Sequence, residues 1–127
     1  MLTISGFTIC FLTALLTGLS LNISRLRIRY RVSFGHASHR DLEVAVRAHG
    51  NGLEQSMLFI ALLLIAELLH SPVHLLVVTA VSFAVARCLH VVAIFMRLLL
   101  LRQIAHVTSL LMQLACSGMI LWKLVSA

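Results

Sequence analysis

The sequence predicts an all-α integral membrane protein built as a bundle of four transmembrane helices. Of its 127 residues 61% are hydrophobic and 11% are charged, whereas soluble domains are about 45–50% apolar and about 25% charged. The apolar residues fall into four stretches, each close to the ~20 residues that a helix needs to cross a hydrocarbon core about 30 Å thick. We expect spans at about residues 2–24, 41–69, 73–96 and 102–125, in a single domain.

The distribution of arginine predicts the orientation of these spans. The first connection and the flanks of the third are rich in arginine, and the second connection has neither arginine nor lysine. The arginines concerned are Arg25, Arg27, Arg29, Arg31, Arg40, Arg97 and Arg102. Because Arg and Lys are enriched in cytoplasmic loops, we expect both termini on the non-cytoplasmic side, with the first span retained rather than cleaved as a signal peptide.

The first connection, residues 25–40, is the only sizeable one. Gly35 is its expected turn. Asp41 is the expected N-cap of the second span, and Glu43 follows in the first turn, where a carboxylate interacts favourably with the helix dipole.

A polar stripe interrupts the second span. Arg47, Asn51 and Glu54 are spaced i, i+4, i+7, which places them on one helix face. Charged groups facing acyl chains cost about 3 kcal/mol on insertion scales, so the stripe must face protein, water or a ligand. Gly50 and Gly52 weaken the same helix and indicate the close approach of another backbone, as in helix packing, or of a ligand.

The later spans carry polar residues at a matching depth. Arg87 and His90 share one face of the third span, and Arg102 begins the fourth, which ends in the interfacial anchors Trp122 and Lys123. With the predicted orientation these residues, the polar stripe and Arg25 converge near the cytoplasmic surface as a cationic pocket with one carboxylate. Such a pocket suits an anion that also carries an ammonium. Alternatively, the arginines and the glutamate pair with one another to hold the bundle together.

Other ligands fit the sequence poorly. The histidines of the first connection and beyond lack a closed ligand set, and the three cysteines lie in separate apolar segments without a C-x-x-C pair. These residues are His36, His39, His49, Cys10, Cys88 and Cys116. We therefore expect no metal site, and we interpret the net charge of +6 as a signal of topology and lipid attraction rather than of nucleic-acid binding.

Three motifs, RLRIRYRVSFG, RAHGNGLEQ and ARCLHVV, resemble the bacterial branch of the MAPEG family, the membrane-associated proteins of eicosanoid and glutathione metabolism. The resemblance covers nearly the whole chain. It implies a homotrimer in the bacterial inner membrane that binds glutathione between protomers near the cytoplasmic face. By motif position the peptide would contact Arg47, Asn51, Glu54, Arg87 and His90, with Arg25 reaching in from a neighbouring protomer. Arg102 occupies the place of the arginine that stabilises the glutathione thiolate.

The resemblance implies a membrane glutathione transferase that conjugates glutathione to lipophilic electrophiles, or reduces peroxides with it. A cation beside the thiol favours the reactive thiolate. Tyrosines that many members carry are absent, and Ile94 and His106 stand near those positions. This departure motivates a second hypothesis, a non-catalytic membrane protein of the same fold that binds glutathione or an anionic lipid. A small transporter is the third, although nearby arginines suit proton-coupled export at Glu54 poorly.

Overall fold

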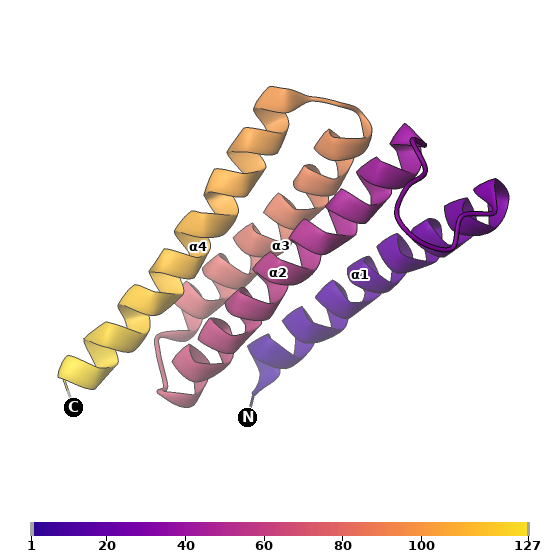
Figure 1. Ribbon diagram of the computed structural model, residues 1–127. Coiled ribbons are helices and arrows are strands. Elements are labelled where there is room, and N and C mark those ends of the chain that lie inside the picture. The colour runs from indigo at the N-terminus through magenta and orange to yellow at the C-terminus, as the bar shows by residue number, and fades with distance from the viewer. Residues whose placement is uncertain (1, 127) are drawn as a thin grey trace.

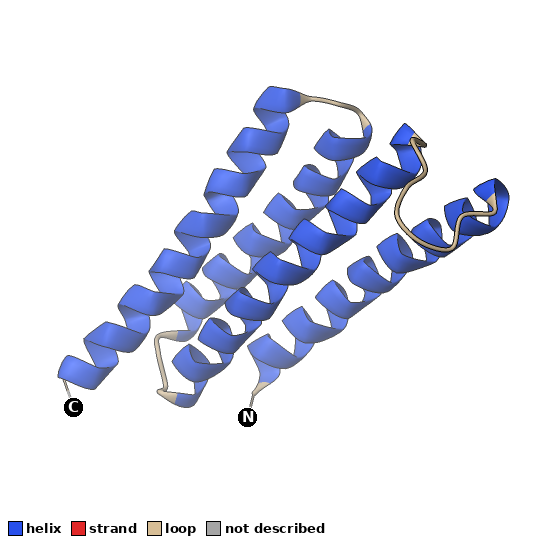
Figure 2. Cartoon of the chain, viewed as in Figure 1, coloured by secondary structure: helices blue, strands red, loops and turns tan. Residues whose placement is uncertain are grey.

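The computed structural model describes residues 2–126, which form four consecutive antiparallel α-helices and no strand (Figures 1 and 2). The helices are α1 (Thr3–Tyr30), α2 (Arg40–Leu68), α3 (Val73–Phe95) and α4 (Leu99–Val125). Each is long and apolar enough to cross a membrane, so the predicted all-α membrane fold is confirmed. Both ends of the described chain lie at one end of the bundle (Figure 1). The side of the membrane on which they lie stays a prediction.

Helix α1 is longer than the span predicted for it. It continues to Tyr30, so Arg25, Arg27 and Arg29 lie on the helix and the assignment of residues 25–30 to a loop is wrong. The connection proper is residues 31–39, where Gly35 takes a positive φ of +64°, as a turn requires. Arg27 donates to the carbonyls of Ser33 (3.3 Å) and Gly35 (3.0 Å). Arg27 therefore holds the connection from the last turns of α1 instead of belonging to it.

The start of α2 also differs from the prediction. The helix begins at Arg40 with His39 as its N-cap, so Asp41 lies in the first turn and is not the cap. Its carboxylate accepts a hydrogen bond from the Tyr30 hydroxyl, and the Tyr30 ring stacks on His39 with centroids 3.9 Å apart. The Asp41 carboxylate therefore bonds to the end of α1 instead of capping α2, which was the prediction from the sequence.

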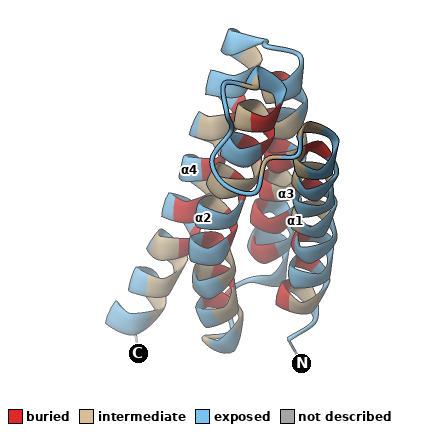
Figure 3. Ribbon diagram, turned by 45° about the vertical axis from the view of Figure 1, so that its right-hand side comes forward, coloured by how far each residue is buried: buried red, intermediate tan, exposed pale blue. Residues whose placement is uncertain are grey.

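The core lies where all four helices meet. Its central residues are Leu12, Phe59, Leu63, Ala66, Leu76, Ala80, Phe83 and Cys116, and the Phe59 and Phe83 rings stack with centroids 3.8 Å apart. Helices α1 and α4 pack on different sides of the α2–α3 pair (Figure 1). Large hydrophobic side chains cover much of the outer surface, and Figure 3 shows exposed residues along every helix. Such a surface suits contact with lipid.

Two polar side chains inside the bundle, those of Glu67 and Gln113, bond to another helix. The Glu67 carboxylate near the end of α2 accepts hydrogen bonds from the backbone N–H groups of Ile4 (3.0 Å) and Ser5 (2.8 Å), and from the Ser5 hydroxyl. It therefore caps the N-terminus of α1 from a neighbouring helix. The Gln113 amide of α4 donates to the carbonyl and the side chain of Gln55. These bonds fix the register of α2 against α1 and α4.

Candidate functional site

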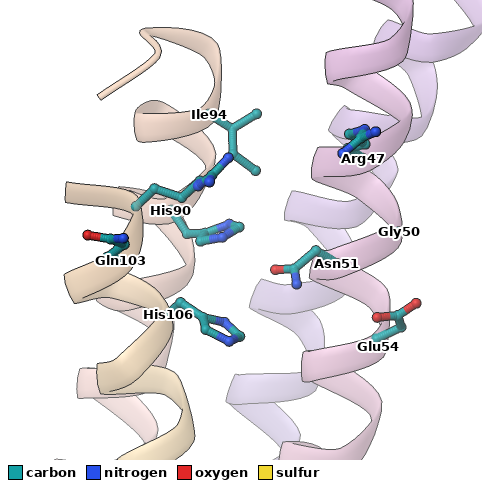
Figure 4. Close-up of a pocket in the computed structure, with 9 residues that line it drawn as sticks. Arg47, Gly50, Asn51, Glu54, His90, Ile94, Gln103 and His106 are labelled. Carbon is teal, nitrogen blue, oxygen red and sulfur yellow. The ribbon is translucent and has the colours of Figure 1, made fainter. Parts of the chain in front are cut away.

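A cavity of about 520 Å³ lies between α2, α3 and α4, toward the end of the bundle that holds the α3–α4 connection (Figure 4). The residues that line it are Arg47, Gly50, Asn51, Glu54, His90, Ile94, Arg102, Gln103 and His106. Five of the seven predicted site residues are among them. The spacing argument therefore found the faces of α2, α3 and α4 that meet here.

The polar stripe of α2 forms one wall. Arg47 is exposed and pairs with Glu43 one turn earlier, at an Nη2–Oε1 distance of 3.0 Å. Such i, i+4 surface pairs contribute about 0.3–0.5 kcal/mol, so Arg47 can turn toward a stronger anion at little cost. Within residues 2–126 neither Glu54 nor Arg87 forms an ion pair. The alternative in which Arg47, Glu54 and Arg87 pair with one another is therefore not what the structure shows.

Arg87 lies behind this wall. Its side chain is 1% exposed, and its Nη2 donates to the Asn51 Oδ1 at 3.3 Å, while Nε and Nη1 have no partner within residues 2–126. The Asn51 oxygen is thus occupied and its NH₂ group is left to donate. Figure 4 shows the Asn51 side chain extending toward His90 and His106. Arg87 therefore orients Asn51 without lining the cavity itself.

The opposite wall belongs to α3 and α4. His90 is 4% exposed, and its buried Nδ1 has no partner in the described part of the chain. The His106 ring lies 6.2 Å from the His90 ring, centroid to centroid. Arg102 lies one turn before His106, inside α4 rather than at its start, because the helix begins at Leu99 instead of the predicted residue 102. Two imidazoles and a guanidinium thus face the polar stripe.

His106 and Gln103 line the cavity although they were not among the predicted site residues. The available signal was the i, i+4 spacing from Arg102 to His106, which places both on one face of α4. Arg25, by contrast, lies on α1 outside the cavity and donates to the Asn22 Oδ1 at 2.9 Å. Its expected reach into the site of a neighbouring protomer stays a prediction.

The two glycines of α2 have different surroundings. A Cβ at Gly52 would lie 3.1 Å from the Leu16 Cδ2 of α1, whereas a Cβ at Gly50 would meet nothing within 4 Å. Gly52 thus serves the packing of α1 on α2, and Gly50 lines the cavity. The packing explanation therefore applies to Gly52, and the approach of a ligand to Gly50 stays a prediction.

Comparison with known proteins gives a consistent result over most of the chain. The sequence profile of the MAPEG family matches residues 5–122. Inner membrane protein YecN of Escherichia coli strain K12 is 30% identical over 76 residues, and so is YecN of E. coli O6:H1 strain CFT073. The aligned part is 60% of this chain and 58% of YecN. No solved structure matches the chain.

Proposed function

The chain belongs to the MAPEG family and is a multi-pass protein of the bacterial inner membrane, and on that premise we propose that it is a membrane glutathione transferase. In this proposal glutathione binds in the cavity between α2, α3 and α4, and its thiolate attacks electrophiles or peroxides dissolved in the membrane.

The observation that carries the proposal is the unbalanced charge of the cavity. Its lining includes the guanidinium groups of Arg47 and Arg102 and the single carboxylate of Glu54, so the lining carries one more positive charge than negative. Glutathione carries two carboxylates and one ammonium at neutral pH, which is a net charge of −1. The cavity also lies within the range of about 300–1,000 Å³ that is common for small-molecule sites.

Each wall has a distinct role in this proposal. Arg47 binds a carboxylate, Glu54 binds the ammonium, and the NH₂ group of Asn51 donates to a peptide carbonyl or carboxylate. The sulfur then lies at the α4 wall, where the Arg102 guanidinium favours the thiolate over the thiol. The electrophile enters sideways from the lipid that surrounds the apolar outer surface.

Assembly of the site from more than one copy is part of the proposal. Arg47 and Glu54 are exposed in the single chain, and charged groups in a membrane need water or protein around them. A homotrimer, as the resemblance implies, would cover them and bring Arg25 of a neighbouring copy to the peptide. The mass of the detergent-solubilised protein tests this, because a monomer would leave Arg25 without access to the site.

The function is tested by titrating glutathione calorimetrically into the purified protein. We expect saturable binding that Arg47→Ala and Glu54→Gln each weaken about tenfold or more, the loss of about 1.4 kcal/mol or more in a charge-assisted contact. Lys123→Ala, at the far end of α4, is the control and should bind normally. Glu54→Gln should not weaken binding of a glutathione analogue that lacks the ammonium. Normal affinity in both site variants would remove these residues from the site.

A second candidate is a glutathione-binding protein without transferase activity. One observation favours it: no cavity-lining residue in the described part of the chain carries a hydroxyl, so no hydroxyl of the lining can donate to the sulfur. Binding of glutathione without conjugation or peroxidase activity over a broad electrophile panel would favour this candidate over the transferase.

A further inference from the structure

Three groups in the cavity can accept a proton, and their different positions indicate different roles. They are the Glu54 carboxylate on α2 and the imidazoles of His90 on α3 and His106 on α4. Glu54 lies on the peptide-binding wall, where the proposed function pairs it with the ammonium. His90 is 4% exposed, whereas His106 is only partly buried. His106 is therefore the proton acceptor most accessible to a ligand at the α4 wall.

We propose that His106 accepts the proton of the glutathione thiol. This inference rests on the proposed function and names the base for it. His106 lies one turn beyond Arg102 on the same helix face, so a sulfur beside the guanidinium is also beside the imidazole. No hydrogen bond to another side chain or to the backbone holds its ring within residues 2–126. Figure 4 shows the ring projecting from α4 toward the α2 wall.

The charges around His106 explain why proton transfer from the glutathione thiol to its imidazole is favourable. Arg47 and Glu54 face it from α2, Arg87 and His90 lie on α3, and Arg102 lies on its own helix. The arginines oppose an added positive charge at the imidazole. Transfer from thiol to imidazole, however, creates a thiolate beside the new cation and leaves the net charge of the cavity unchanged. A thiolate and an imidazolium in contact stabilise each other strongly where water is scarce.

The step balances in atoms and charge. The S–H bond breaks, its proton forms an N–H bond on His106, and the electron pair stays on sulfur. The thiolate then forms a C–S bond with an activated alkene, and the alkene electrons move to the adjacent carbon. The imidazolium of His106 returns its proton to that carbon. The products are the thioether and a neutral imidazole, with no oxidant or further reactant consumed.

The test follows thiolate absorbance and proton release together. Glutathione is titrated into the wild-type protein at neutral pH in two buffers that differ in ionisation enthalpy. We expect the thiolate band to appear with almost no proton released to the buffer. His106→Gln should still bind glutathione, lose most of the thiolate band and conjugate about 100-fold more slowly, a typical contribution of a general base.

Two further variants guard against effects on folding. His106→Ala opens space in the cavity, and added imidazole should restore its thiolate band and conjugation. His74→Gln, in the exposed first turn of α3, should behave as the wild type.

The outcomes separate the two proposals. A wild-type protein that does not bind glutathione overturns the proposed function, and this inference with it. Binding without a thiolate band, a thiolate band with one proton released per glutathione, or an unchanged band in His106→Gln would each overturn the role of His106 alone.

Discussion

Replacing Arg87 by methionine should stabilise the protein and weaken glutathione binding at the same time. Arg87 is 1% exposed, and two of its three nitrogens, Nε and Nη1, have no partner among residues 2–126. An unsatisfied buried donor costs about 1–3 kcal/mol. Methionine removes both donors and the charge, and its unbranched side chain fills a similar space.

The substitution of Arg87 also removes one hydrogen bond. The Nη2–Asn51 Oδ1 distance of 3.3 Å is long for such a bond, so about 1 kcal/mol is a generous value. Removing two unsatisfied donors and losing one hydrogen bond gives a net stabilisation of about 1–5 kcal/mol. We expect this gain in the unfolding free energy of the ligand-free protein, measured by thermal or denaturant unfolding in detergent.

Glutathione binding should change in the opposite direction. Without Arg87 the Asn51 amide is no longer held with its NH₂ group toward the cavity, and we expect affinity to fall about fivefold to tenfold, or about 1 kcal/mol. Because Arg87 acts through Asn51, the double variant Asn51→Ala/Arg87→Met should bind no more weakly than Asn51→Ala alone. Lower stability of Arg87→Met, or additive losses of affinity in the double variant, would refute this reasoning and show that Arg87 contacts the ligand directly.

Two further substitutions test the fold and the cavity separately. Glu67→Gln replaces the carboxylate that caps α1 with a neutral amide, so we expect a loss of about 1–2 kcal/mol in unfolding free energy, while glutathione affinity stays unchanged. Wild-type stability would show that the negative charge of this cap contributes nothing to folding. Gly50→Ala meets no atom within 4 Å and should stabilise α2 by about 1 kcal/mol, while its methyl group in the cavity weakens glutathione binding. Gly52→Ala, which faces α1 at Leu16, is its matched control and should bind normally; equal affinity of the two variants would place the peptide away from Gly50.

The spacing of polar residues predicted much of the cavity. Arg47, Asn51 and Glu54 recur at helical spacing, so a straight helix puts them on one face whatever else the chain does. The depth at which His90 and Arg102 meet that face follows from the lengths of the antiparallel spans. These features depend on local geometry, which a sequence carries directly.

The pairing of individual groups did not follow from spacing. The carboxylate of Asp41 bonds to Tyr30 instead of capping α2, and Arg47 pairs with Glu43 instead of with Glu54. A helical pattern indicates which face of a helix a side chain occupies. Its hydrogen-bond partner on another helix also depends on how that helix is rotated and shifted, which the pattern does not indicate.

The sequence by itself determined that this protein has four helices long and apolar enough to span a membrane and that a polar stripe lies on one face of the second, because hydrophobic length and helical period are local properties. Only the tertiary structure decided that Arg87 lies behind Asn51, that Glu67 caps α1 and that His106 lies beside His90 in one wall of the cavity. Each of these depends on how neighbouring helices pack, and packing is settled by the fit of many side chains at once rather than by the spacing of a few.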